Sequence, residues 1–147
     1  MYFVDRKKIE NALVYMEDLH DAYSQTTTLD SLLKKLALER MAQGWIEAII
    51  DVGNQMIDGF IMRDPGSYED IIDILDDEKV IKPSEADSLK KVIGLRKMLV
   101  QDFTKVDHTY IQQTLKDNLR SITVFPERVR KYLEQELGPV SAFLPDE

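Results

Sequence analysis

The chain has 147 residues, a length that suits one domain with its own core and leaves little room for two. Hydrophobic residues make up 44% of it, which argues against disorder, and the absence of cysteine excludes disulfides, thiolate metal sites and cysteine nucleophiles. The formal net charge of −8 argues against a protein that coats nucleic acid through its overall charge, but it leaves room for a small local RNA site or a basic partner.

The N-terminal segment offers no sign of export or membrane insertion. It becomes charged at Asp5 and contains no apolar stretch of the kind found in signal peptides. No apolar run in the chain approaches the ~18 residues that a membrane-spanning helix needs. We therefore expect a soluble, cytoplasmic protein.

Apolar residues recur at intervals of three and four along almost the whole chain, which predicts helices rather than strands. A first helix is expected over residues 5–23, and the second and longest helix over residues 30–62, with a connector rich in serine and threonine between them. Gly44, Gly53 and Gly59 would each cost ~1 kcal/mol in the interior of this second helix. Their presence predicts a neighbour packed closely against it, and Trp45 beside them is expected in the core, with a contact at a dimer face as the alternative.

The middle of the chain contains two predicted breaks. A turn at residues 63–66 precedes a short third helix that Ser67 should cap. The second break, at Lys82-Pro83, precedes residues 84–87, which are close to a capping box. A fourth helix is expected from there over residues 86–103.

The last third of the chain predicts two more helices. Asp107 can cap a fifth helix, which the β-branched residues 122–124 and Pro126 should break or kink. A last helix then ends near Gly138. Together these elements predict an all-α fold, a single up-and-down bundle of about five to six helices formed by residues 1–147.

The common catalytic and metal-binding patterns are absent from the sequence. The two histidines, His20 and His108, are far apart and lack an HExxH-type partner. Neither a glycine-rich phosphate loop nor a Gly-x-Ser-x-Gly motif is present. We therefore expect no metal and no cofactor, and the residues taken alone predict no chemistry beyond a helical bundle.

Two segments carry a resemblance to a known family. Within residues 36–58, Glu39-Arg40 precedes an apolar-rich helix and the run Ile-Asp-Val-Gly-Asn at residues 50–54. Residues 85–107, EADSLKKVIGLRKMLVQDFTKVD, are similar to the signature Met-x-Gly-x-Arg-Asn-x-Leu-Val-His-x-Tyr-x-x-Val-Asp. On these segments the chain resembles the HepT-like family of the HEPN superfamily, and the resemblance covers nearly the whole chain in order.

The resemblance implies a bacterial helical protein that forms a homodimer with a cleft at the dimer interface. Many members of this family are metal-independent RNases, and are toxins paired with a minimal nucleotidyltransferase antitoxin. The antitoxin silences the toxin by attaching AMP to the tyrosine of an Arg-x4-His-x-Tyr motif. RNA and a nucleotidyltransferase are therefore the partners that the resemblance implies.

Only part of this motif is present. Arg96 matches its arginine and residues 97–100 match its spacer, but Gln101 replaces the histidine and Phe103 replaces the tyrosine. RNA cleavage by the ribose 2′-hydroxyl needs fixed positive charge at the phosphate, which Arg96 supplies, and a group that transfers a proton, which Gln101 cannot do. Loss of such a group costs ~10²–10⁴ in rate, so weak or absent activity is expected. Phe103 has no hydroxyl that could accept AMP.

The spacing of these residues constrains the site. Arg96 and Phe103 nearly share one helical face, whereas Gln101 lies roughly 140° away at ~100° per residue. The site therefore needs a helix end near Phe103, a second subunit, or both. The sequence His108-Thr109-Tyr110 also has the form His-x-Tyr, but it lies twelve residues after Arg96 and beyond the predicted cap at Asp107.

Each motif residue also has a purely structural interpretation. Arg96 would be a surface arginine paired with a carboxylate, Gln101 would be solvated, and Phe103 would extend the apolar stripe of Leu99. The leading functional prediction is the RNase toxin of a toxin–antitoxin system with a degenerate motif. The alternative is a catalytically silent helical dimer that binds a nucleotidyltransferase or RNA as a scaffold.

Overall fold

The structure, a computed structural model, describes residues 3–26 and 28–138, so the predicted domain of residues 1–147 extends beyond the described part at both ends. Every regular element in the described part is an α-helix, as predicted. The helices are α1 (Arg6–Ser24), α2 (Leu32–Gly59), α3 (Tyr68–Asp77), α4 (Pro83–Ile93), α5 (Arg96–Val100) and α6 (His108–Leu137). None of the described helices combines the length and the apolar character needed to cross a membrane.

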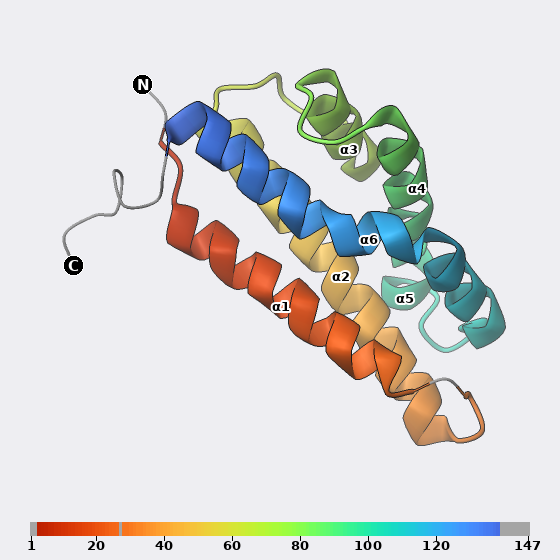
Figure 1. Cartoon of the computed structure of the whole chain (residues 1–147). Helices are drawn as coiled ribbons and strands as arrows, with labels where there is room; N and C mark the ends of the chain where they lie inside the picture. Colours follow the sequence, from red (N-terminus) through yellow and green to blue (C-terminus); the bar gives the residue numbers. More distant parts are fainter. Residues whose placement is uncertain (1–2, 27, 139–147) are drawn as a thin grey trace.

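The long helices α1, α2 and α6 pack side by side, and α3 and α4 cover α2 and α6 from the other side (Figure 1). The helices α1 and α2 run in opposite directions, and α6 returns antiparallel to α1. The short helix α5 contacts α2. The predicted helical bundle is therefore confirmed, and α2 is its central element.

Side-chain caps determine where most helices begin. Asp5, Ser31, Ser67 and Asp107 each accept a hydrogen bond from the backbone N–H three residues further on. Such a bond satisfies a donor that the first turn of a helix leaves free. The starts predicted around Asp5, Ser67 and Asp107 are confirmed, and α2 begins after Ser31 rather than at Asp30.

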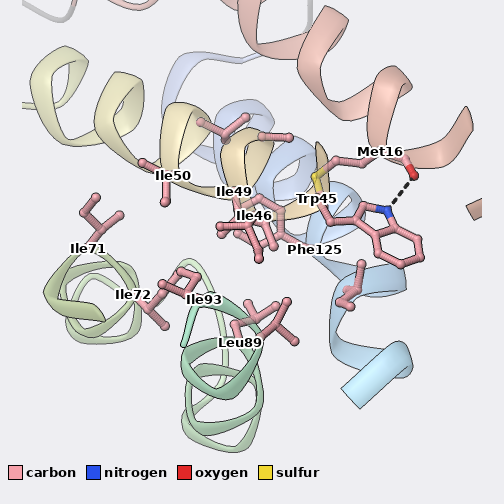
Figure 2. Packing of buried hydrophobic residues seen from close by; sticks show 14 of the residues in the cluster. Met16, Trp45, Ile46, Ile49, Ile50, Ile71, Ile72, Leu89, Ile93 and Phe125 are labelled. Carbon is pink, nitrogen blue, oxygen red and sulfur yellow. Dashed lines mark hydrogen bonds between the residues drawn. The ribbon is translucent and has the colours of Figure 1, made fainter. Parts of the chain in front are cut away.

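The core forms where α2 meets the other helices. Trp45 is fully buried, as predicted, and its Nε1 donates a hydrogen bond of 3.0 Å to the carbonyl oxygen of Met16 in α1. Figure 2 shows the α2 residues Ile46 and Ile49 facing α4 and Phe125 of α6. The single indole donor therefore has a partner, and the α2 residues beside it pack against apolar side chains.

The glycines of α2 lie where neighbouring side chains approach its backbone closely. A Cβ atom at Gly44 would lie 2.7 Å from Leu19 and 2.8 Å from Tyr15, both in α1. A Cβ atom at Gly53 would lie 2.4 Å from Cγ2 of Ile71 in α3. The predicted close packing against this glycine-containing helix is confirmed.

The predicted fourth helix is present, but its predicted bounds, residues 86–103, are wrong. It begins earlier, at Pro83, because the carboxylate of Glu85 accepts the backbone N–H of Lys82 at 3.0 Å. It ends at Ile93, since the chain turns at Gly94 before the separate helix α5 begins. Glycine is a poor helix former, and the turn allows Leu95 to bury its side chain.

The predicted break of the fifth helix at residues 122–126, with a separate last helix after it, is also wrong, because α6 continues from His108 to Leu137 through Pro126. Proline removes one backbone hydrogen bond from a helix interior and strains the preceding turn. Here Phe125, Pro126 and Val129 are all buried, so core packing offsets this cost. The helix ends at Gly138, as predicted, where φ is 82°.

Candidate functional site

Arg96, the arginine of the motif pattern, begins α5 and lies against α2. Its Nε donates a hydrogen bond of 2.8 Å to Oε1 of Glu47, and its guanidinium group lies 4.6 Å from the ring centroid of Tyr68. The hydrogen bond to Glu47 raises the pKa of the Arg96 guanidinium above its ordinary value, so the group remains charged. The interpretation of Arg96 as an arginine paired with a carboxylate is therefore confirmed.

This pairing uses only part of the guanidinium group. Within residues 3–26 and 28–138, neither Nη1 nor Nη2 of Arg96 has a hydrogen-bond partner. No side-chain nitrogen in the same part of the chain is both buried and unpaired, so these two atoms reach solvent. Glu47 and Tyr68 thus hold one edge and one face of the group. The two terminal nitrogens are left in the fork geometry that binds an oxyanion.

Gln101 and Phe103 lie at and beyond the end of α5. Gln101 is the C-terminal cap, its backbone N–H donates to the carbonyl oxygen of Lys97 at 2.8 Å, and its side chain is exposed. Phe103 lies in the connector of residues 101–107 and is 65% exposed, whereas Leu99 is buried. A helix end near Phe103, one of the two expected ways to form the site, is present because α5 ends at Val100. The interpretation of Phe103 as part of the Leu99 stripe is wrong.

His108 begins α6 and contacts the same helix as Arg96. Its Nε2 lies 2.6 Å from Oε2 of Glu39, and the two side chains are 18% and 22% exposed. Glu39 and Glu47 are eight residues apart on α2, which corresponds to about 12 Å along the helix axis. Two carboxylates of α2, about 12 Å apart along its axis, therefore each hold one of these side chains.

The three partners of these residues were missed by sequence reasoning. Glu47 and Glu39 are separated from Arg96 and His108 by 49 and 69 residues, so no local pattern relates them. Tyr68 follows the cap of α3 and carried no signal beyond its apolar spacing. Glu39 and Glu47 both lay within the segment of residues 36–58 that resembled the family, but only Glu39 was one of the matched motif residues.

The motif residues do not line the cavity between the α3–α4 turn and the C-terminal half of α6. That cavity has a volume of about 560 Å³ and includes neither Arg96 nor His108. In the part of the chain that the structure describes, no group of three or more histidine or carboxylate side chains is arranged to hold a metal ion.

Comparison with known proteins agrees with the resemblance. The model of the family described as ribonuclease HepT-like matches residues 9–129. The chain belongs to this family. It is 51% identical over 143 residues to the Bacillus subtilis (strain 168) protein named "Putative RNase YutE", and the match covers 97% of this chain and 99% of that protein.

Solved structures show the same fold. The structure of YutE, described as a cytosolic protein of unknown function, covers 97% of this chain and 100% of its own, with 51% identity and a TM-score of 0.93. A tri-AMPylated HEPN toxin from Shewanella oneidensis, in complex with an MNT antitoxin, is 20% identical with a TM-score of 0.65. That match covers 84% of this chain and 91% of the toxin, and at this identity it shows the fold alone.

Proposed function

We propose that this protein is the ribonuclease toxin component of a toxin–antitoxin system, with Arg96 retained and the rest of its catalytic motif degenerate. Membership of the HepT-like ribonuclease family supports the activity class. The observation that carries the proposal is Arg96, whose charge is held by Glu47 while Nη1 and Nη2 reach solvent. This is the arrangement that an arginine needs to bind a phosphate group of RNA.

The other two motif positions limit the reaction. Gln101 can donate a hydrogen bond to a phosphate oxygen, but its amide does not exchange a proton near neutral pH. Phe103 is exposed and presents no hydroxyl group to a nucleotidyltransferase. The protein therefore cleaves RNA weakly or not at all through this motif, and its control by a partner does not run through AMP on residue 103.

The proposed partners are a second copy of this chain and a minimal nucleotidyltransferase antitoxin. Leu32, Leu33 and Leu36 at the start of α2 are 69%, 78% and 49% exposed. Apolar surface gathered in one place is typical of protein contacts, and we assign this face to the homodimer. The Shewanella oneidensis toxin of the same fold is in complex with an antitoxin of the nucleotidyltransferase (MNT) type, which supports the second partner.

Restoring the motif tests the proposed function. The variant Gln101→His with Phe103→Tyr should cleave labelled RNA faster than the wild type, because a group that transfers protons joins the charge of Arg96. Adding Arg96→Ala to this variant should abolish the gain. A restored variant without any gain, which still binds a nucleotidyltransferase, would instead support the scaffold alternative.

A further inference from the structure

His108 and Glu39 form a side-chain pair that the degenerate motif does not use. Nε2 of His108 lies 2.6 Å from the Glu39 carboxylate, and Nδ1 has no hydrogen-bond partner among the described residues. Because no buried side-chain nitrogen in those residues is unpaired, Nδ1 reaches solvent. In enzymes with a histidine base, a carboxylate on one ring nitrogen holds the ring while the other nitrogen exchanges the proton.

The pair lies on the same face of α2 as the partner of Arg96. Glu39, Gln43 and Glu47 follow one another at four-residue intervals, which places them along one side of the helix. Glu39 and Glu47 lie about 12 Å apart along the axis, and we take this as the spacing of the two groups that they hold, Arg96 and His108. At this spacing the two side chains act on different phosphate groups. It corresponds to about three to four nucleotides of a stacked single strand, at 3.4 Å each.

The segment between the two residues offers a surface for an unpaired base. The connector of residues 101–107 joins α5, which begins with Arg96, to α6, which begins with His108. Phe103 lies in this connector with 65% of its surface exposed. An exposed aromatic ring is a stacking platform for bases that are free of a duplex.

We propose that His108, positioned by Glu39, is the proton-transfer group for cleavage of single-stranded RNA, while Arg96 binds a neighbouring phosphate of the same strand. This inference rests on the proposed ribonuclease function and deepens it. His108 thereby replaces the group that is missing at Gln101, from a different helix. The substrate class is unpaired RNA long enough to reach from Arg96 to His108.

The reaction needs no co-reactant. Nδ1 of His108 accepts the proton of a ribose 2′-hydroxyl, and O2′ attacks the adjacent phosphorus atom. The bond between phosphorus and O5′ breaks, water donates a proton to the departing O5′, and the imidazole returns its proton to the hydroxide that remains. The products are a 2′,3′-cyclic phosphate and a 5′-hydroxyl end, and their combined atoms are those of the substrate strand.

Steady-state cleavage of single-stranded oligoribonucleotides by the full chain tests this proposal. His108→Gln retains a donor for Glu39 but cannot act as a base, so kcat should fall by about 10²-fold or more while KM changes little. Arg96→Ala should mainly raise KM. Tetranucleotides and longer strands should be cleaved, whereas dinucleotides, which cannot reach both residues, should be cleaved far more slowly.

Two further readouts separate catalysis from a structural role of the pair. His108→Ala should regain activity when imidazole is added, and Glu39→Gln should lower kcat without changing KM. The matched control is His20→Gln, because His20 contributes to a cavity with Pro126, which is about 27 Å further along α6 than His108. This control should cleave like the wild type.

Several results would overturn the proposal. One is an unchanged kcat in His108→Gln, and another is a wild type that cleaves no strand of any length. A third is a loss in His108→Gln matched by a lower melting temperature, without rescue of His108→Ala by imidazole, because the pair would then only join α6 to α2. Failure of the proposed function itself gives a different result, since the Gln101→His, Phe103→Tyr variant would then be inactive as well.

Discussion

Replacing Gly53 by alanine tests the packing of α2 against α3. In an unobstructed helix this change stabilises a protein by up to about 1 kcal/mol, because alanine has the higher helix propensity. Here the new Cβ atom would lie 2.4 Å from Cγ2 of Ile71, well inside the ordinary carbon–carbon contact distance of about 3.5–4.0 Å. Cγ2 of a β-branched residue is attached directly to Cβ, so it cannot move away without rotating the whole side chain.

Overpacking of this kind costs about 1–3 kcal/mol, which outweighs the gain in propensity. We therefore expect the free energy of unfolding to fall by about 1–2 kcal/mol, measured by urea denaturation followed by circular dichroism. Ile71→Ala should make the same glycine substitution favourable, so a double-mutant cycle should show coupling. Gly66→Ala is the control, because its nearest atom would lie at 3.7 Å. A more stable Gly53→Ala protein would refute the reasoning.

Three further predictions concern assembly, regulation and acid stability. Light scattering at micromolar concentration should give twice the protomer mass of 17.0 kDa, and a clean monomer would contradict the assigned dimer face. Incubation with a nucleotidyltransferase partner and ATP should leave residue 103 unmodified by intact-mass spectrometry, whereas AMP mapped to the exposed Tyr110 would show that another residue has taken over this role. Burial opposes ionisation of Glu85, but the hydrogen bonds from Arg128 and from the backbone of Lys82 prevail and hold its pKa below the ordinary value. A carboxylate whose pKa is lower in the folded state stabilises the protein above its unfolded pKa and loses this effect as the pH falls through the folded pKa. Glu85→Gln should thus lower the free energy of unfolding by about 1–3 kcal/mol at pH 7, and denaturation curves should show no such loss under acidic conditions.

Helix starts could be predicted from the sequence because capping is local. Asp5, Ser67 and Asp107 each accept a hydrogen bond from a backbone N–H only three residues away, so the signal lies within one short stretch of sequence. The wrong helix boundaries at Gly94 and Pro126 have a common physical cause. At both positions the burial of nearby side chains outweighs the local helix propensity. Burial depends on residues distant in sequence, which helix propensity does not take into account.

In the candidate site, too, features that depend on nearby residues could be predicted and features that depend on distant residues could not. The motif spacing led to Arg96 and to a helix end near Phe103 as one way to form the site, both of which depend on residues close in sequence. The carboxylates that hold Arg96 and His108 come from α2, and only the folded chain brings them there. The exposure of Phe103 was not predicted, because its spacing from Leu99 placed it on the buried stripe of a helix, whereas α5 ends at Val100.

Trp45 makes the molecule convenient to observe in solution. It is the only tryptophan in the chain, so the intrinsic fluorescence excited at the indole band arises from this one buried ring. Its bond to Met16 spans the contact between α1 and α2, and its emission will shift to longer wavelength when these helices separate. Glu47, the partner of Arg96, lies two residues further along and so points to a different side of α2. Oligonucleotides bound at Arg96 should therefore leave the emission unchanged, which allows unfolding and ligand binding to be followed separately in one sample.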